Sequence, residues 1–391
     1  ICHNESGHNL GPIKYGLFYC DCPELGKCKI CDLSKLPSSP SHTLADAMDV
    51  DSDTVVGAPV SRPALDTTIS KGINTGAIKF FETMEPEKVY SPLSISVAMG
   101  LIHLGARTQT EYELTSFFDT KYSIEDIIKL HTYFNGDVAK MSNVLFLNRE
   151  TASVINPDYT LSISEIALCR TEDFTNSKVI SDTINRYISD NTNGLIKDVI
   201  KPEIIHPLCV AILVNTVYFK CNWLHPFNKR FTDPDANFTS ELTGAQLKVP
   251  LMNITTSLKY HSSYNYHMVE IPYANREYVM GVALAKNLSS ITSPAVRGNV
   301  LRDISQPLDA YYKEVNLFLP KFTQRKECKL VPQFKKHGVT TLFDKNTADL
   351  SGISSSVYIS DIIHKAVVIV DEEGTEAAAT TVAVMRSESC I

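Results

Sequence analysis

Cysteines are the residues of this 391-residue chain that most plainly offer chemistry, and five of the ten lie in its first 32 residues. Cys28 and Cys31 have the spacing of a zinc knuckle, and Cys20 and Cys22 lie close by. Cysteines at this density could hold zinc, or they could pair as disulfides in a small extracellular module. Residues 1–32 are too few to bury a core of their own, so such links must support them.

Four N-x-S/T sequons favour the disulfide alternative, because they are acceptors for N-linked glycans in secreted proteins. They lie at Asn4, Asn237, Asn253 and Asn287. The chain begins with Ile1 rather than Met and shows no apolar leader, a pattern that fits a secreted protein after signal removal. We therefore predict a secreted, disulfide-bonded glycoprotein with no metal site.

The other five cysteines are distributed along the rest of the chain, at Cys169, Cys209, Cys221, Cys328 and Cys390. Cys209 and Cys221 are expected to share one extended strand, which would hold them too far apart to bond. The five cysteines of the first region cannot all pair among themselves. Either a disulfide ties that region to the rest of the chain, or two thiols stay free.

No sequence motif indicates catalysis. Histidines and carboxylates are numerous enough for acid–base chemistry, but the chain has no G-x-S-x-G, H-E-x-x-H, P-loop or G-x-G-x-x-G pattern. We therefore predict no catalytic residues and no cofactor.

The charge pattern argues against polyanions as partners. A net charge of -7 provides no basic footprint for nucleic acid. Lys121 and Lys129 are separated by acidic residues, and Lys197 and Lys201 are only a pair, so we predict no strong heparin-like site. The apolar run 208–214 has the length of a strand rather than of a membrane span, and we predict no membrane partner.

Composition divides the chain into three regions. The Cys-rich extension, 1–32, is followed by a linker rich in Ser, Pro and Asp over residues 33–68, and a folded body occupies 69–391. Predicted helices run from Ile69 to near Pro86, over 123–134 and over 177–188, and predicted strands cover 208–220, 266–272, 278–285, 314–319 and 364–370. Because this order is not a regular βαβ alternation, we predict an α+β fold with large, mainly antiparallel sheets.

The segment from Val370 to Thr381 runs from a β-branched strand through Gly374 into an alanine- and threonine-rich stretch. Gly374 accepts backbone conformations that other residues avoid. Every second position beyond it is small, namely Thr375, Ala377, Ala379, Thr381 and Ala383. In a strand these side chains would share one face, which could slide into a sheet without a clash. The same composition also suits an alanine-rich helix or a loose tail.

With its flanks, this segment resembles the reactive-loop hinge of the serpins. The resemblance assigns the hinge to Glu372, Glu373, Gly374, Thr375, Glu376, Ala377, Ala378 and Ala379. Further matching motifs are Ser91–Ile95 with Leu104–Arg107, Asn191–Ile196, Asn215–Lys220 with Trp223 and Phe227, Leu319–Phe322 and Ser360–Ala366. Each motif is weak by itself, but together they cover about residues 80–391 and imply a single serpin fold.

The resemblance also assigns roles to polar residues that would otherwise be explained as satisfied core or turn groups. Ser91, Ser94, Asn215 and His364 match the serpin shutter, whose side chains hydrogen-bond beneath sheet A where the sheet must part. Trp223 matches the aromatic residue of the breach, where loop insertion begins. Three positions depart from the usual serpin residues: Cys221 and Thr108 stand in place of Gly, and Tyr187 stands in place of Trp.

The function implied by the resemblance is inhibition of a serine protease by a suicide-substrate mechanism, with a role in an extracellular protease cascade. The resemblance therefore implies a protein that is not an enzyme. The protease would cut the loop, and the acylated loop would insert into sheet A as a new strand and distort the protease. Serpins also include carriers and other non-inhibitors, so a carrier or binding protein is the alternative.

The serpin loop spacing places the scissile bond at Glu388–Ser389, which implies a protease that accepts Glu in its primary pocket. Arg386–Ser387 would suit a trypsin-like protease but would leave the loop two residues short. Serpins continue beyond this bond through strands that complete the core. We therefore expect a loop-cleaved chain, with its C-terminal peptide present as a separate chain and partner.

Overall fold

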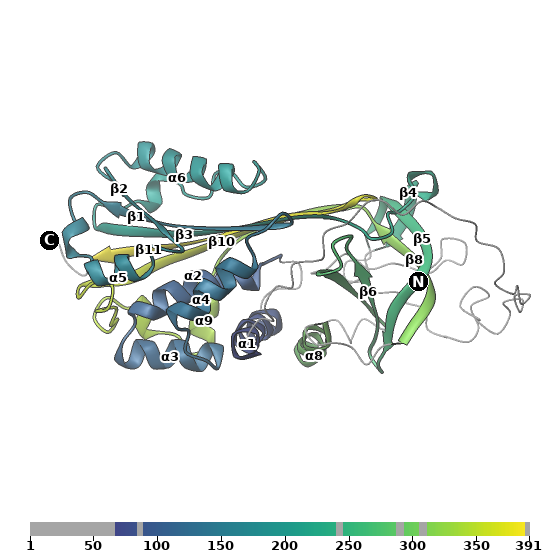
Figure 1. Cartoon of the computed structure of the whole chain (residues 1–391), viewed down its shortest axis with the longest axis horizontal. Helices are drawn as coiled ribbons and strands as arrows, with labels where there is room; N and C mark the ends of the chain where they lie inside the picture. Colours follow the sequence, from purple (N-terminus) through teal and green to yellow (C-terminus); the bar gives the residue numbers. More distant parts are fainter. Residues whose placement is uncertain (1–66, 84–88, 240–244, 287–292, 305–310, 388–391) are drawn as a thin grey trace, which may run out of the picture.

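The computed structural model describes residues 67–83, 89–239, 245–286, 293–304 and 311–387 (Figure 1). Several predictions lie outside these residues: the extension 1–32, most of the linker, Asn4, Asn287, Glu388, Ser389 and Cys390. The first described helix begins at Thr67, two residues before the predicted helix start at Ile69, and the division of the chain into three regions stays a prediction.

Helices and strands alternate irregularly along the chain, as the α+β prediction requires. The helices are α1 (Thr67–Thr83), α2 (Pro92–Gly105), α3 (Thr108–Phe118), α4 (Ile124–Tyr133), α5 (Pro157–Ser162), α6 (Ser177–Asn191), α8 (Pro294–Ile304) and α9 (Val331–Lys336). The strands are β1 (Ala139–Asn148), β2 (Leu168–Glu172), β3 (Cys209–Asn222), β4 (Asp233–Thr239), β5 (Gln246–Ser262), β6 (Tyr266–Pro272), β7 (Val279–Ala285), β8 (Tyr311–Pro320), β9 (Phe322–Lys329), β10 (Val357–Val370) and β11 (Gly374–Ser387). No helix in the described ranges is both long and apolar enough to cross a membrane.

The larger sheet has six strands in the order β2-β1-β3-β11-β10-β9. Its pairs are antiparallel except for β1 with β2, which is parallel, so the prediction of a mainly antiparallel sheet is confirmed. A second sheet has the order β4-β5-β6-β7, and β8 also pairs with β5. The five predicted strands correspond to β3, β6, β7, β8 and β10, but β10 begins at Val357, well before the predicted start at residue 364.

Helices lie on both faces of the larger sheet (Figure 1), and an apolar cluster fills the space on each side. Helix α6 covers one face, where Ile180, Ile184 and Ile188 pack on strand side chains such as Val214 and Val382. Helices α2, α3 and α4 lie on the opposite face in a larger core cluster. A sheet with both faces covered needs apolar or small side chains on both sides of its central strands.

Helix α2 is buried around most of its circumference, which explains its lack of an amphipathic pattern. Its start is set by Ser91, whose hydroxyl accepts a hydrogen bond from the Ser94 backbone N–H, and by Pro92 in the first turn. The capped N-terminus therefore points Ser91 and Ser94 toward the middle of the larger sheet, where they meet β3, β10 and β11.

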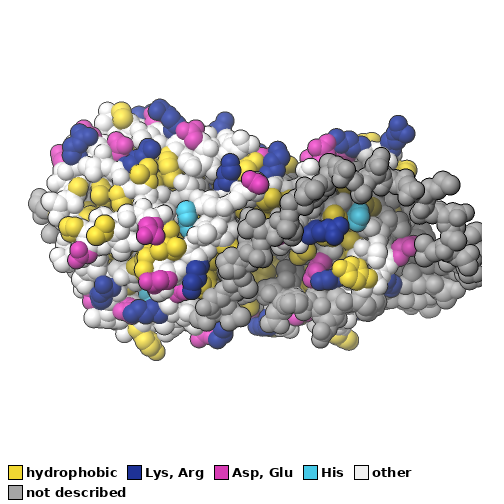
Figure 2. Space-filling view, in the orientation of Figure 1, with side chains coloured by type: hydrophobic (Ala, Val, Ile, Leu, Met, Phe, Trp, Pro, Cys, Tyr) yellow, Lys and Arg dark blue, Asp and Glu magenta, His cyan; other side chains and the backbone are white. Residues whose placement is uncertain are grey.

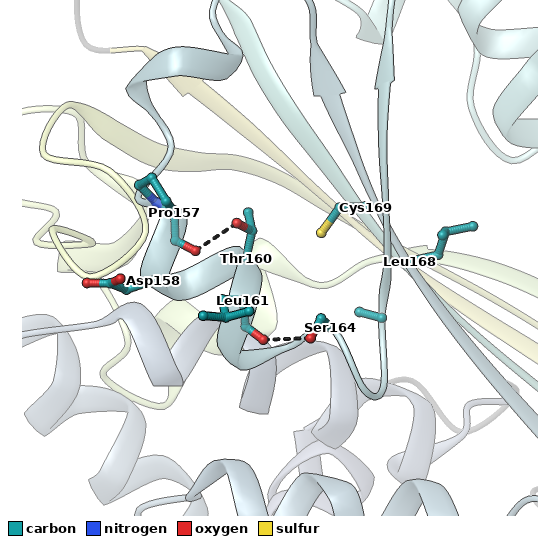
Figure 3. Close-up of a pocket in the computed structure, with 8 residues that line it drawn as sticks. Pro157, Asp158, Thr160, Leu161, Ser164, Leu168 and Cys169 are labelled. Carbon is teal, nitrogen blue, oxygen red and sulfur yellow. Dashed lines mark hydrogen bonds between the residues drawn. The ribbon is translucent and has the colours of Figure 1, made fainter.

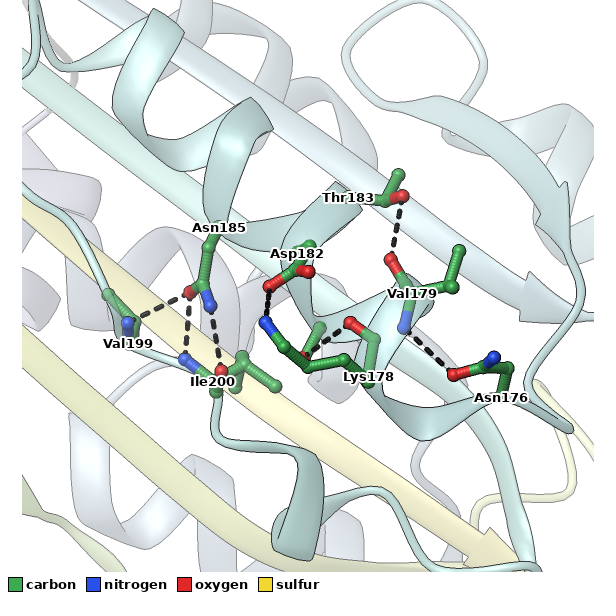
Figure 4. A network of polar contacts seen from close by, with 9 residues as sticks. Asn176, Lys178, Val179, Asp182, Thr183, Asn185, Val199 and Ile200 are labelled. Carbon is green, nitrogen blue, oxygen red and sulfur yellow. Dashed lines mark hydrogen bonds and ion pairs between the residues drawn. The ribbon is translucent and has the colours of Figure 1, made fainter.

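Helix α6 is tied to the chain that follows it by Asn185 (Figure 4). The Asn185 Oδ1 accepts hydrogen bonds from the backbone N–H groups of Val199 and Ile200, both at 2.9 Å. Its Nδ2 donates to the Ile200 carbonyl at 2.7 Å. One amide side chain thus satisfies three backbone groups and holds the segment that returns from α6 toward the sheet.

We predict that Asn185→Ala lowers the free energy of unfolding by about 1–3 kcal/mol, because it leaves these backbone groups without partners. Urea unfolding followed by circular dichroism would measure the change. The control is Asp182→Ala, which removes an exposed ion pair with Lys178 on the same helix and should change stability by less than about 0.5 kcal/mol. Equal stability of Asn185→Ala and the wild type would contradict the anchoring role.

Candidate functional site

The hinge segment is a central strand of the larger sheet. Residues 374–387 form β11, which is antiparallel to β3 on one side and to β10 on the other. The register places Gly374 opposite Asn222 of β3 and Thr375 opposite Val370 of β10. A strand is therefore the correct prediction for this segment, and the alternatives of a helix or a loose tail are wrong for residues 374–387.

The two faces of β11 enter the two cores. Ala378, Val382 and Val384 belong to the cluster beneath α6. Ala383 and Met385 belong to the core on the other side, and Thr381 meets Ser94 of α2 there. The predicted sharing of one face by alternate small residues is therefore correct, and that face is directed away from α6.

Gly374 is needed because there is no space for a side chain, and not because its backbone adopts an unusual conformation. Its φ does not lie in the left-handed region, which among the described glycines only Gly194 and Gly338 occupy. A Cβ at position 374 would instead lie 2.2 Å from the carbonyl oxygen of Cys221 and 2.8 Å from the Asn222 Cα. The absence of a side chain lets β11 begin directly beside β3.

The predicted shutter residues converge in a buried cluster, which also contains Thr381 from β11. His364 Nε2 accepts from the Ser91 backbone N–H at 3.0 Å, so its Nδ1 carries the proton and donates to Thr381 Oγ1 at 2.9 Å. The Thr381 hydroxyl then donates to Ser94 Oγ at 2.9 Å, and Ser94 donates to Asn215 Oδ1 at 2.5 Å. Every hydroxyl in this chain of bonds is both donor and acceptor.

The hydrogen-bond chain continues into β1 through the amide of Asn215. Its Nδ2 donates to Asn143 Oδ1 at 2.8 Å, and Asn143 Nδ2 donates to the Ile166 carbonyl at 3.0 Å. The polar cluster therefore joins α2 to β1, β3, β11 and β10. Thr381 and Asn143 were not assigned to the shutter from sequence. Thr381 is on the small-residue face that the sequence did reveal, but nothing in the sequence indicated its hydrogen bonds.

His364 is fully buried and neutral. Burial lowers the pKa of His364 from 6.5 to about 3, because no carboxylate compensates for the lost hydration of the charged ring. A neutral ring is what the cluster requires, since Nε2 must accept the Ser91 N–H.

Trp223 lies beside the start of β11, and its role at a breach stays a prediction. The indole N–H donates to the Asp371 carbonyl at 2.9 Å, and the Trp223 backbone N–H donates to the Glu373 carbonyl at 2.9 Å. Its ring stacks on Tyr273, with 4.7 Å between ring centroids and 13° between planes. Trp223 thus binds the backbone of the turn between β10 and β11 at two carbonyl groups, and the Phe227 backbone N–H binds a third, that of Glu372.

Each acidic side chain of the hinge has a cationic partner. Glu372 is buried, and although burial alone would raise its pKa, hydrogen bonds from Lys321 at 2.7 Å and Thr232 at 2.9 Å lower it. Glu373 is exposed and pairs with Lys229 at 2.7 Å. Lys220 lies 3.6 Å from Glu376 Oε2. The sequence placed these residues in the hinge without indicating their partners.

Only one of the two candidate scissile bonds, Arg386–Ser387, lies within the described residues. Glu388 and Ser389 lie outside the described residues. Arg386 and Ser387 are the last residues of β11, where Arg386 lies 3.5 Å from Asp361. Ser387 is buried, pairs with Val357 and donates its N–H to the Leu208 carbonyl at 2.9 Å. A protease has no access to this bond in the inserted strand.

Two sequons lie within the described residues and differ in their environments. Asn237 is exposed on β4. Asn253 is half-buried on β5, and its Nδ2 donates to Asn316 Oδ1 at 2.6 Å. Glycosylation at both stays a prediction, and Asn237 has the more accessible side chain.

Within the described body, Cys169, Cys209 and Cys221 are free thiols. Cys209 and Cys221 lie on the same strand, β3, as predicted. A disulfide to the extension stays a prediction, because the extension lies outside the described residues.

A surface pocket of about 600 Å³ lies between α5 and β2, away from the hinge (Figure 3). Its hydroxyls are already used locally, since Thr160 donates to the Pro157 carbonyl and Ser164 to the Leu161 carbonyl. Burial raises the pKa of Cys169, which disfavours the nucleophilic thiolate. The pocket therefore presents no activated group for catalysis.

Charged side chains of both signs are interspersed on the face drawn in Figure 2. Within the part of the chain that the structure describes, Lys71, Lys121, Lys178 and Lys248 each pair with a carboxylate. The absence of a strong polyanion site stays a prediction.

Comparison with known proteins identifies the architecture. The family model described as serpin (serine protease inhibitor) matches residues 72–390. This chain belongs to the serpin family. A serpin-like protein of Acanthamoeba polyphaga mimivirus, itself named as uncharacterized, is 35% identical over 328 residues, which are 82% of this chain and 80% of that protein. A protein of Cyanea capillata named serine protease inhibitor is 29% identical over 326 residues, 78% of this chain and 86% of that protein.

Solved structures show the serpin fold as well. Cleaved Serpin 42Da has a TM-score of 0.74 and 24% identity, covering 82% of this chain and 90% of that chain. Thyroxine-binding globulin, solved with a thyroxine conjugate, has a TM-score of 0.68 and 21% identity, covering 82% and 98%. The serpin family therefore contains protease inhibitors, and its fold also serves a hormone-binding protein. Family membership favours a protein that is not an enzyme.

The three departures from usual serpin residues have local explanations in this serpin. Thr108 has a φ of 50°, the left-handed region that explains why Gly is frequent there, and its hydroxyl donates to Asp349 at 2.8 Å. The Tyr187 hydroxyl lies 2.5 Å from Ser142 Oγ and ties α6 to β1. The buried Cys221 side chain belongs to the core beside Trp223.

We predict that Gly374→Ala destabilises the form with β11 in the sheet by at least about 1–3 kcal/mol, because the added Cβ meets the Cys221 carbonyl oxygen. Urea unfolding of that form would measure the loss. Glu373→Ala changes the exposed neighbouring residue and serves as the control. A Gly374→Ala variant as stable as the wild type would contradict the close approach of β11 to β3.

We predict that the buried His364 makes this serpin less stable as the pH falls from about 6.5 toward 3. The pKa of His364 is 6.5 in the unfolded chain and about 3 in the fold, so in this window the unfolded state binds one more proton. The contribution present above pH 6.5 is lost at up to about 1.4 kcal/mol per pH unit.

Urea unfolding between pH 7 and 4 would measure this slope. His364→Gln should lower stability at pH 7 and remove this part of the pH dependence. His225→Gln, a change at an exposed histidine, should leave the slope contributed by His364 intact. Equal slopes for His364→Gln and the wild type would rule out His364 as the titrating group.

Proposed function

We propose that this serpin inhibits a serine protease as a suicide substrate. The protease serine attacks the carbonyl of the scissile residue, the peptide beyond that bond is released, and the serpin stays attached as an acyl-enzyme. Insertion of the cut loop as β11 then carries the protease across the molecule and distorts its active site before water hydrolyses the ester.

The single observation that carries this proposal is the seating of residues 374–387 between β3 and β10. The side chains on β11 are compatible with rapid insertion, because Thr375, Ala377, Ala379 and Thr381 are small and uncharged. The match to a family model described as serine protease inhibitors agrees with this function.

We propose Glu388–Ser389 as the scissile bond and a Glu-specific protease as the target. The contacts of Ser387 support this choice, because a cut at Arg386–Ser387 would separate Ser387 from β11 and forfeit its pairing with Val357 and its bond to Leu208. A trypsin-like target acting at Arg386 is the alternative.

The setting that we propose is extracellular, in a protease cascade. The sequons and the Cys-rich extension support secretion. Exposed Asn237 offers one accessible glycan acceptor within the body. The C-terminal peptide, once released from the bond, would remain as a separate chain that completes the core.

The proposal predicts that the intact protein forms a covalent adduct with at least one protease in a panel of Glu-specific and trypsin-like enzymes. Denaturing gels would detect the adduct, and mass spectrometry would identify the first residue of the released peptide. Ser389 as that residue supports Glu388, and loss of the adduct in Glu388→Ala but not in Arg386→Ala confirms it.

A released peptide that begins at Ser387 would instead assign the bond to Arg386. Clean cleavage by the panel without any adduct would contradict inhibition of these protease classes and would favour the carrier alternative. Expression in eukaryotic cells would test the extracellular assignment: the protein should appear in the medium, and glycosidase should lower the mass of that secreted protein.

A further inference from the structure

We infer that two tyrosine hydroxyls, those of Tyr273 and Tyr218, recognise the first two residues of the inserting loop from opposite faces of the sheet. Tyr273 binds the hydroxyl of Thr375, and Tyr218 binds the carboxylate of Glu376. This inference rests on the proposed function, because it names the residues that position the loop as insertion begins.

Tyr273 follows directly after β6 and is held rigidly. Its ring stacks on Trp223 and meets the edge of Phe219 at a centroid distance of 5.2 Å. Trp223 and Tyr273 also form a β-bridge, so the backbone of Tyr273 is fixed as well as its ring. The hydroxyl donates to Thr375 Oγ1 at 2.8 Å in a fully buried contact. Packing therefore sets the direction of this donor before the loop arrives.

Tyr218 lies on β3 opposite Ala378, and its side chain is on the face of the sheet that α6 covers. Its hydroxyl donates to Glu376 Oε1 at 2.7 Å. The same oxygen accepts from Asn193 Nδ2 at 3.2 Å, and Asn193 belongs to the turn that follows α6. Glu376 thus links β11 to β3 and to the turn that follows α6.

These bonds exist only when β11 is in the sheet. Tyr273, Tyr218 and Asn193 belong to elements other than the loop, whereas Thr375 and Glu376 arrive with the loop. They are the first two residues after Gly374, so their bonds form at the start of the strand. An interaction that is absent before insertion and present early in it favours insertion over hydrolysis of the acyl-enzyme.

The chemistry of the two contacts is complementary. Both tyrosines stay protonated, because burial raises the pKa of each, to about 12 for Tyr218, where the Glu376 carboxylate also contributes. An ionised carboxylate only accepts hydrogen bonds, and a threonine hydroxyl accepts where valine of the same shape does not. Thr375 and Glu376 therefore offer two acceptors to two donors.

A double-mutant cycle on the full protein with the protease that forms an adduct tests the Tyr273 contact. The readout is the partition ratio, the moles of serpin hydrolysed per mole of protease trapped, which is the stoichiometry of inhibition minus one. Tyr273→Phe and Thr375→Val should each raise it by about 2- to 10-fold, the effect of one neutral hydrogen bond. The double variant should resemble either single variant, and Thr375→Ser, which restores the hydroxyl, should behave as wild type.

The Tyr218 contact is tested with Tyr218→Phe and Glu376→Gln. Because the acceptor is charged, each change should raise the partition ratio by about 10- to 100-fold, again without additivity. Tyr187→Phe is the matched control, since that half-buried hydroxyl on α6 contacts Ser142 of β1 and not β11. Additive effects, or effects no larger than that of Tyr187→Phe, would overturn the inference.

A second readout separates this inference from the proposed function. The loop of each variant is cut by a protease that forms no adduct, and the rise in the unfolding midpoint caused by cutting is measured. If no protease is trapped but cutting still raises the unfolding midpoint of the wild type, the inhibitory function fails. The effects of the tyrosine variants on that rise can still be measured. A gain in Tyr273→Phe and Tyr218→Phe equal to that of the wild type would overturn the inference, as would no gain in the wild type.

Discussion

The position of β11 between β3 and β10 is the constraint on which the rest of the structure depends. A strand in the middle of a sheet must match the backbone ladders of both neighbours and fit an apolar layer on each face. Most residues of 374–387 meet both requirements with small or aliphatic side chains. The strand begins at Gly374, where the neighbouring strand β3 leaves no room even for a Cβ, so any other residue would clash with it.

A polar cluster in the middle of this apolar sandwich would be costly unless every group were satisfied. Thr381 completes it, because its hydroxyl accepts from His364 and donates to Ser94. The cluster lies between α2 and the strands β3, β11 and β10. Under the proposed insertion, these groups would have to exchange partners when the sheet opens. Because buried, directional hydrogen bonds permit few arrangements, such a change would favour two discrete states.

The hinge is more than a compact, flexible segment. Its acidic side chains are bound by Lys321, Lys229 and Lys220, and its threonine and second glutamate are bound by tyrosine hydroxyls. These partners lie on β3, on the chain after β6 and on the segments beside β4 and β9, which are distant from the hinge in sequence. Local patterns cannot reveal such contacts, because periodicity reports which face a residue occupies and not what it meets there.

The sequence by itself determined the α+β class, helices α1, α4 and α6, strands β3, β6, β7, β8 and β10, and the alternation of small residues after Gly374, because these follow from local periodicity and from motifs. It also identified Ser91, Ser94, Asn215, His364 and Trp223 through their resemblance to serpins. Only the tertiary structure decided that Thr381 and Asn143 join the shutter, that Gly374 is required for space rather than for its φ, and that Tyr273 and Tyr218 meet the hinge. The physical reason is that hydrogen bonds and steric limits act between atoms that the fold brings together from separate segments, and their partners are not encoded in the spacing of any one segment.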